Sequence, residues 1–328
     1  NGCSSLDHAD KILFIPDALI YMLTGKAICE YTIASTSQLL NPVTKDLDED
    51  LLMSIGLKRE QFGPMTQPGT VIGPITEQLQ KLTGLSADVK VVAIAAHDTA
   101  SAVAAVPAKD ANYAYLSCGT WSLMGIESPE PIITDESFKQ NFTNEGGIDG
   151  TTRFLKNICG LWLFEQCRPE WKDVPAEIGP LTALCETTTF DSIINPDDPS
   201  FAHPASMCTA IREYCEKTGQ IAPETPAEYI RGIYLSLAHR YKAIIDILEK
   251  MSPVKIDVLH VIGGGSKNPH LMQLAANAIR RPVICGPTEG TALGNILLQI
   301  KSQGLVSSLT EMRKIVANSI ELITYNPK

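Results

Sequence analysis

The chain has 328 residues, of which 44% are hydrophobic and 20% charged, the balance of an ordinary globular protein long enough for two domains. Its net charge of -10 argues against a nucleic-acid-binding surface, because phosphate contacts need clustered Lys and Arg. No apolar run approaches the ~20 residues of a membrane span, and we recognise no signal peptide. The nine cysteines form no Cys-x-x-Cys pair, which favours reduced thiols in a cytoplasmic protein.

The first third of the chain has the pattern of helices and loops. A helical stretch over residues 10–23 ends at Gly25. Residues 89–95 then read as a strand that leads directly into 97–103, whose small residues suit a helix packed closely on a sheet. The polar turn at 107–110 is the best candidate boundary between two well-patterned regions.

After this boundary the sequence predicts a hairpin, with strands over 113–117 and 121–126. Residues 141–150 read as a loop, and residues 154–167 as a helix with its apolar side at 155, 158, 161 and 162. A long helix begins at Thr225, which has capping-box spacing to Glu228.

The most informative segment is the glycine run at 263–265, which follows a predicted strand over 255–262. Asn268 and Pro269 supply a helix N-cap and a first-turn residue directly after it. The run matches neither Gly-x-Gly-x-x-Gly nor the P-loop. It is therefore either a tight packing turn or a place where the backbone approaches a flat or anionic ligand. A strand over 281–285 and a last helix that opens at 288–295 complete the pattern.

Asp98 lies where the predicted strand gives way to a helix. A carboxylate at a helix N-terminus stays ionised, because free amides and the helix dipole stabilise it. One interpretation makes Asp98 a plain N-cap. The other makes it a base that receives a hydroxyl proton, which suits phosphoryl transfer because the loose transition state needs little deprotonation before attack. His97 beside it is either structural or orients a substrate.

Other polar residues also suit a site. The turn at 117–120, Ser-Cys-Gly-Thr, offers successive amides for an anion, or is a bare tight turn. Asn157 and Glu165 are polar residues in the otherwise apolar predicted helix, so one of them can line a site. The histidines and cysteines show no metal-ligand spacing, and no Gly-x-Ser-x-Gly elbow appears.

Five segments in this order resemble the FGGY family of carbohydrate kinases. They are Ala-His-Asp-Thr-Ala-Ser-Ala at 96–102, Ser-Cys-Gly-Thr-Trp-Ser-Leu-Met-Gly at 117–125, Leu-Lys-Asn-Ile-Cys-Gly-Leu-Trp at 155–162, the glycine turn, and Glu-Gly-Thr-Ala-Leu-Gly-Asn at 289–295. The resemblance covers nearly the whole chain and is strongest to the members that phosphorylate L-rhamnulose. Other ketose kinases, for L-fuculose or a pentulose, are the alternatives within the family.

The resemblance implies an α/β fold of the actin-like, ribonuclease H-like ATPase type, with two domains and a cleft between them. Residues 1–106 would be the C-terminal part of the first, sugar-binding domain, and 107–328 the second, nucleotide-binding domain. Sugar and ATP with Mg²⁺ would be the ligands, and the protein a monomer or a homodimer. Asp98 would be the catalytic base. The expected sugar contacts are His97, Thr99 and Asn157, and the expected ATP contacts are Thr120, Glu165, Gly263, Gly264 and Gly265.

Family members open with an acidic Asp-x-Gly-Thr/Ser hairpin that binds metal–ATP, and this sequence contains none. We therefore expect a kinase that lacks the opening part of its first domain. The alternative from another class is an inactive nucleotide-binding fragment of such a kinase.

Overall fold

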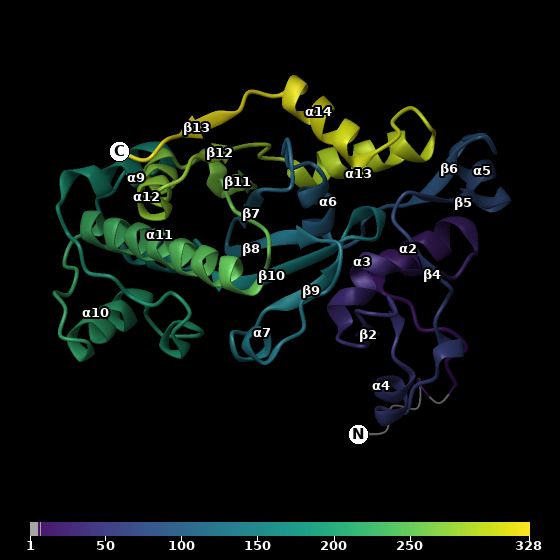
Figure 1. Cartoon of the computed structure of the whole chain (residues 1–328), viewed down its shortest axis with the longest axis horizontal. Coiled ribbons are helices and arrows are strands. Elements are labelled where there is room, and N and C mark those ends of the chain that lie inside the picture. Colours follow the sequence, from purple (N-terminus) through teal and green to yellow (C-terminus); the bar gives the residue numbers. More distant parts are fainter. Residues whose placement is uncertain (1–5, 7) are drawn as a thin grey trace.

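The computed structural model describes residue 6 and residues 8–328, and it confirms the expected α/β fold (Figure 1). The first part of the chain contains only short elements and three small two-stranded sheets. Its helices are α2 (Ile15–Thr24), α3 (Tyr31–Ala34), α4 (Glu49–Ser54) and α5 (Glu77–Thr83). Its strands are β1 (Cys29–Glu30), β2 (Leu40–Asn41), β3 (Asp46–Leu47), β4 (Met65–Thr66), β5 (Thr70–Pro74) and β6 (Lys90–Ala93).

The rest of the chain is built on a seven-stranded sheet in the order β13-β12-β11-β7-β8-β10-β9. The pairs β11–β7 and β11–β12 are parallel, and all other neighbours are antiparallel. The strands are β7 (Tyr113–Cys118), β8 (Trp121–Ser128), β9 (Thr143–Gly146), β10 (Thr152–Cys159), β11 (Val258–Ile262), β12 (Val283–Cys285) and β13 (Ile323–Tyr325). The helices are α6 (Asp98–Ala104), α7 (Asp135–Lys139), α8 (Trp162–Cys167), α9 (Ile178–Ala183), α10 (Met207–Lys217), α11 (Pro226–Met251), α12 (Pro269–Ile279), α13 (Gly290–Ser302) and α14 (Leu309–Ser319).

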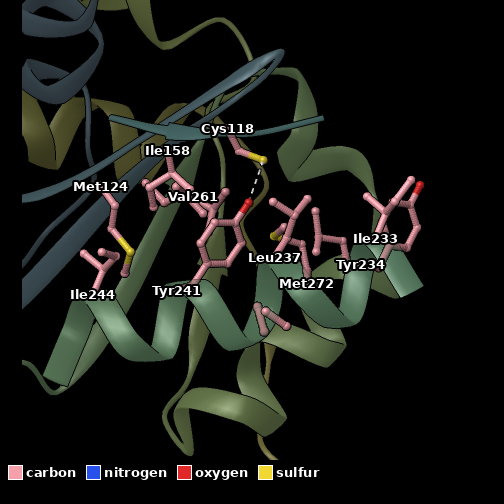
Figure 2. Close-up of a cluster of buried hydrophobic side chains, with 14 of the residues drawn as sticks. Cys118, Met124, Ile158, Ile233, Tyr234, Leu237, Tyr241, Ile244, Val261 and Met272 are labelled. Atoms are coloured by element: carbon pink, nitrogen blue, oxygen red, sulfur yellow. Dashed lines mark hydrogen bonds between the residues drawn. The ribbon is translucent and has the colours of Figure 1, made fainter. Parts of the chain in front are cut away.

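The main hydrophobic core lies between the sheet and α11, with α12 beside it (Figure 2). Leu237, Tyr241 and Ile244 of α11 are fully buried against Met124 and Ile158 of the sheet. The Tyr241 hydroxyl is paired with Ser122 Oγ at 3.0 Å, so this polar group is satisfied inside the core. The side chains alternate along β10, so Leu155 instead faces α6 on the other side of the sheet.

Helices α6 and α13 cross with almost no space between them. A Cβ atom built on Gly294 of α13 would lie 1.8 Å from the carbonyl oxygen of Ser101 in α6. Only glycine permits this approach, which brings the two backbones into contact. The crossing therefore fixes α6, and with it the turn that precedes α6, against the second half of the chain.

Several predictions from the sequence are confirmed. The hairpin is β7–β8, and α11 begins with the capping box of Thr225 and Glu228. Asn268 caps α12 by accepting a hydrogen bond from the Leu271 N–H at 3.1 Å.

The helix expected over 154–167 is wrong. Residues up to Cys159 form strand β10, and the helix α8 starts only at Trp162. The loop expected over 141–150 contains strand β9, which pairs with β10. The helix opening near 288–295 is α13, but it is not the last element, because α14 and β13 follow it.

Candidate active site

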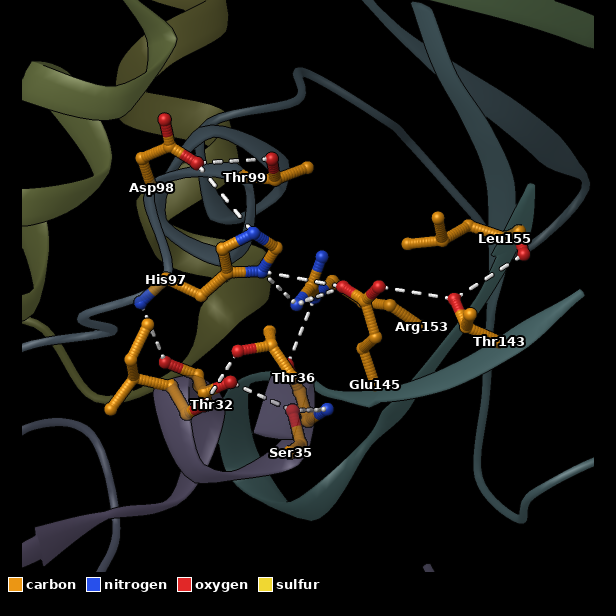
Figure 3. A network of polar contacts seen from close by, with 12 residues as sticks. Thr32, Ser35, Thr36, His97, Asp98, Thr99, Thr143, Glu145, Arg153 and Leu155 are labelled. Atoms are coloured by element: carbon orange, nitrogen blue, oxygen red, sulfur yellow. Dashed lines mark hydrogen bonds and ion pairs between the residues drawn. The ribbon is translucent and has the colours of Figure 1, made fainter. Parts of the chain in front are cut away.

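The turn between β6 and α6 is held from the first part of the chain. The buried Glu30 carboxylate accepts hydrogen bonds from the Ala96 N–H at 3.2 Å and from the Thr32 hydroxyl at 2.6 Å. Thr32 Oγ1 in turn accepts the His97 N–H at 3.1 Å (Figure 3). Burial raises the pKa of Glu30 above its ordinary value, even though these hydrogen bonds oppose the shift. The backbone of the turn is thus fixed before any ligand arrives.

Asp98 is the first residue of α6, and its side chain is 78% exposed. The N-cap position belongs to His97, and no side chain caps this helix. The interpretation of Asp98 as a plain N-cap is therefore wrong. Its carboxylate accepts only the Thr99 hydroxyl at 3.2 Å, among the described residues, so it keeps the capacity to accept a proton from an approaching hydroxyl. Thr99 itself is buried, and its hydroxyl donates its hydrogen bond to Asp98.

The His97 ring lies between Asp98 and two buried charged residues that the sequence did not single out. His97 Nε2 lies 3.7 Å from Asp98 Oδ1. On the other side, Nδ1 lies 2.9 Å from Arg153 Nη2 and 3.3 Å from Glu145 Oε2 (Figure 3). Burial alone would raise the pKa of Glu145, but the Arg153 charge and the hydrogen bond from the Thr143 hydroxyl help to hold that pKa below its ordinary value.

A cavity of about 530 Å³ lies at the ends of β7 and β11. Thr120, Glu165, Gly264 and Gly265, four of the five residues expected to contact ATP, line it. Asn268 and Lys267 close one side, and Phe164, Ile178 and Tyr234 give it apolar walls. A cavity of this volume, with apolar walls, a glycine turn and the Thr120 side chain, is suited to a nucleotide.

The three glycines of the turn have different reasons to be glycine. Gly263 has a φ of 86° and does not line the cavity. A Cβ atom on Gly265 would lie 2.3 Å from Cys118 Sγ, so this residue is needed for packing against β7. Gly264 has open space where a Cβ would stand, and it faces the cavity. The packing interpretation of the run is therefore confirmed at Gly265, whereas the approach of a ligand at Gly264 stays a prediction.

Asn157 lies on strand β10, and not on a helix as the sequence suggested. It lines a second cavity of about 480 Å³, together with Trp121, Trp162 and residues 196–199 and 201–203. Thr120 lines both cavities, whereas His97, Asp98 and Thr99 line neither. The expected sugar contact Asn157 therefore lies in one cavity and most of the expected ATP contacts in the other, with Thr120 common to both.

Within the described part of the chain, no three His, Cys, Asp or Glu residues gather closely enough to hold a metal ion. The structure also contains, among the residues it describes, no helix with the length and apolarity to cross a membrane. The eight described cysteines are all free thiols.

Two sequence models of one family match this chain. The N-terminal domain of the FGGY family of carbohydrate kinases matches residues 1–105, and the C-terminal domain matches residues 114–302. This chain belongs to the FGGY family of carbohydrate kinases. The domain boundary expected at 106–107 falls between the two matched ranges and stays a prediction.

Curated relatives in this FGGY branch are named rhamnulokinases. The rhamnulokinase of Bacteroides thetaiotaomicron is 53% identical over 100% of this chain and 67% of that protein. The rhamnulokinase of Bacillus subtilis is 40% identical over 98% of this chain and 66% of its own length, and that of Pectobacterium atrosepticum is 42% identical over 98% and 64%. The chain therefore spans about two thirds of the length of these relatives.

Solved structures of FGGY-type kinases share the fold. A xylulose kinase from Lactobacillus acidophilus superposes with a TM-score of 0.78 at 20% identity, covering 97% of this chain and 64% of that one. A Plasmodium falciparum glycerol kinase with ADP gives a TM-score of 0.76 at 16% identity, covering 99% and 64%.

Proposed function

We propose that this protein is an ATP-dependent ketose kinase that converts L-rhamnulose to L-rhamnulose 1-phosphate. The observation that carries the proposal is the identity of 39–53% with several curated rhamnulokinases over 98–100% of the chain. The site supports it, because an exposed carboxylate stands at the start of α6 and two cavities that share Thr120 lie in the same protein. The free thiols support a reducing compartment, the cytoplasm.

In this proposal Asp98 takes the proton of the sugar 1-hydroxyl. The hydroxyl oxygen then bonds to the γ-phosphorus of ATP, and the bond from that phosphorus to the β,γ-bridging oxygen breaks to release ADP. Phosphoryl transfer depends mainly on positioning and on stabilisation of charge, so an ordinary ionised Asp is a sufficient base. His97, Thr99 and Asn157 would orient the sugar. Thr120, Glu165 and the glycine turn at Gly263, Gly264 and Gly265 would hold the nucleotide.

Magnesium fits this arrangement as a companion of ATP. Kinases usually hold Mg²⁺ through the substrate phosphates and one or two carboxylates, and not in a dedicated protein cage. The described residues offer no such cage, whereas Asp98 offers one exposed carboxylate. The metal would supply charge neutralisation on the phosphates.

The test is rhamnulose-dependent release of ADP, measured with L-rhamnulose, L-fuculose and a pentulose side by side. We expect L-rhamnulose to give the highest kcat/KM and phosphorus NMR to place the new ester on the 1-hydroxyl. The Asp98→Asn variant, prepared in parallel, controls for contaminating kinases. A higher kcat/KM for L-fuculose or the pentulose would replace the proposed substrate. If no sugar stimulates ADP release, the proposed activity of this chain is wrong and the alternative, an inactive nucleotide-binding fragment, is favoured.

A further inference from the structure

A buried ion pair contacts the side of His97 that faces away from the candidate base. Arg153 and Glu145 stand directly opposite each other on the paired strands β10 and β9, with Arg153 Nη2 and Glu145 Oε2 3.0 Å apart. The Arg153 side chain is fully buried, and that of Glu145 is 9% exposed. Burying two charges is costly, so a pair of this kind calls for a role beyond stability.

The pair is anchored independently of His97. Arg153 Nε donates to the Gly146 carbonyl oxygen at 2.9 Å. Glu145 Oε1 accepts the Thr143 hydroxyl at 3.0 Å. Both side chains are therefore held in place by strand β9, and the histidine ring must adapt to them.

The contact between Arg153 and His97 constrains where the imidazole proton sits. A guanidinium is always protonated in proteins and can only donate. The Arg153 Nη2 hydrogen that points to His97 therefore requires Nδ1 to be an unprotonated acceptor, at 2.9 Å. The other candidate partner, Glu145 Oε2, lies farther from Nδ1, at 3.3 Å, and makes no aligned hydrogen bond within the described residues. A neutral ring with an acceptor at Nδ1 carries its proton on Nε2.

We propose that Arg153 fixes His97 as the Nε2–H tautomer, so that His97 can only donate a hydrogen bond in the site and Asp98 alone can take the hydroxyl proton. Nε2 is the nitrogen that faces Asp98, at 3.7 Å. A proton already on this nitrogen stops the histidine from competing with Asp98 as a base. The hydrogen it carries is available to a sugar oxygen or to the Asp98 carboxylate. The catalytic part of this inference rests on the proposed kinase function; the tautomer does not.

Glu145 acts on both Arg153 and the His97 ring. Its carboxylate neutralises Arg153, which would otherwise stand as an isolated buried charge beside the ring. It also lies close enough to Nδ1 to accept a proton from it if Arg153 were absent. Arg153 and Glu145 are thus positioning residues, and the choice between the two tautomers depends on which of them contacts Nδ1.

The first test is nitrogen NMR of the protein labelled with ¹⁵N in its histidine rings, recorded near pH 7.5 without ligands. Only six histidines are present, and a His97→Gln variant identifies the signals of interest. We expect a protonated Nε2 and a hydrogen-bonded, unprotonated Nδ1. A proton on Nδ1, or on both nitrogens, would overturn the proposal in the unmodified protein, whether or not any variant folds.

The second test replaces the donor. Arg153→Met keeps an unbranched side chain but removes the guanidinium and leaves Glu145 as the only polar partner of Nδ1, so we expect the proton to move to Nδ1. Arg281→Met is the matched control, because Arg281 also pairs with an acid, Glu249 at 3.0 Å, away from this site. It should leave the His97 signals unchanged. Persistence of the Nε2–H tautomer in Arg153→Met would overturn the role of Arg153.

Kinetics separate this inference from the proposed function. A glutamine at position 97 can donate an N–H but cannot take a proton, so His97→Gln should raise the KM for L-rhamnulose and leave kcat within about tenfold. If His97 were the base, kcat would instead fall by ~10²–10⁴, and the inference would fail. If the unmodified protein phosphorylates no ketose, the proposed function fails, while the NMR result still decides the tautomer.

Discussion

The two regions of this chain are held together by different kinds of contact. The region from Ile12 to Ala96 has short elements, small sheets and small buried clusters, and helix α2 exposes Ile15 and Met22 at 78% and 70%. The region from Tyr113 to Tyr325 has one broad sheet with a continuous core against α11 and α12. The second region can therefore keep a cavity rigid by itself, whereas the first relies more on polar backbone contacts and on its junction with strand β9.

Both regions are needed to place the candidate base. Glu30 and Thr32 of the first region hold the backbone of the turn before α6. Glu145 and Arg153 of the second region hold the ring of His97. The junction is close at Gly146, whose N–H donates to Ser35 Oγ at 2.7 Å. The geometry at Asp98 is thus a property of how the regions dock.

The largest effect is expected from Asp98→Asn, which should lower kcat by ~10²–10⁴ through the loss of the base. The side chain is exposed and caps nothing, so the melting temperature and the Kd for an ATP analogue should stay near their original values. Steady-state kinetics and calorimetric titration measure the two. A clear loss of nucleotide affinity would show that Asp98 belongs functionally to the second region.

Core truncations probe the difference in packing. Leu237→Ala, in the large core, should cost about 2–5 kcal/mol of unfolding free energy. Leu52→Ala, equally buried but in the small cluster of the first region, should cost less, because its surroundings can collapse more easily. All three tryptophans lie in the second region, so denaturation followed by tryptophan fluorescence and by circular dichroism separates the regions. If both variants lost the same unfolding free energy, the proposed difference in packing between the two regions would be wrong.

The glycine turn offers a matched pair within the second region. Gly265→Ala should cost about 1–3 kcal/mol of stability, because its Cβ would collide with Cys118. Gly264→Val should leave the melting temperature almost unchanged and weaken ATP-analogue binding by roughly tenfold, an energy of about 1.4 kcal/mol, because its side chain would enter the cavity. If Gly264→Val bound the analogue normally, the cavity would not be the nucleotide site.

The last expected effect concerns pH and the first region alone. Burial raises the pKa of Asp17 to about 7, well above its value in an unfolded chain. The folded state therefore binds the proton more tightly, and its stability should fall as pH rises from about 4 to 7, by up to about 1.4 kcal/mol per unit. Circular dichroism at pH 5.5 and 7.5 should show this loss, and Asp17→Asn should reduce it. If the first region were more stable at pH 7.5 than at pH 5.5, the raised pKa of Asp17 would be contradicted.

The sequence predicted the features that depend on neighbouring residues and missed those that depend on residues far apart in the chain. The capping box of α11, the β7–β8 hairpin and the glycine turn depend on neighbours in the chain, and all three were predictable. Strand β10 was mistaken for a helix because it is a central strand buried on both faces, so its apolar residues do not alternate.

Glu145 and Arg153 were missed for a related reason. They meet because β9 and β10 pair in antiparallel register, which places the two residues directly opposite each other. Recognition of both strands would have revealed this opposite-charge pair. No local signal, however, indicates that His97, more than forty residues earlier in the chain, lies beside it. The expected nucleotide contacts came from the family resemblance, and most of them do line one cavity.

The crossing of α6 and α13 has a mechanical consequence. Since Gly294 and Ser101 meet backbone to backbone, no side chain between them can repack to let the helices slide. If one region rotated against the other about this contact, the parts far from the contact would move most. Asp98 lies three residues from Ser101, about 4.5 Å along the helix, so a rotation of about 10° would displace it by only ~0.8 Å. The carboxylate of the candidate base would therefore move less in such a rotation than any part of either region farther from the contact.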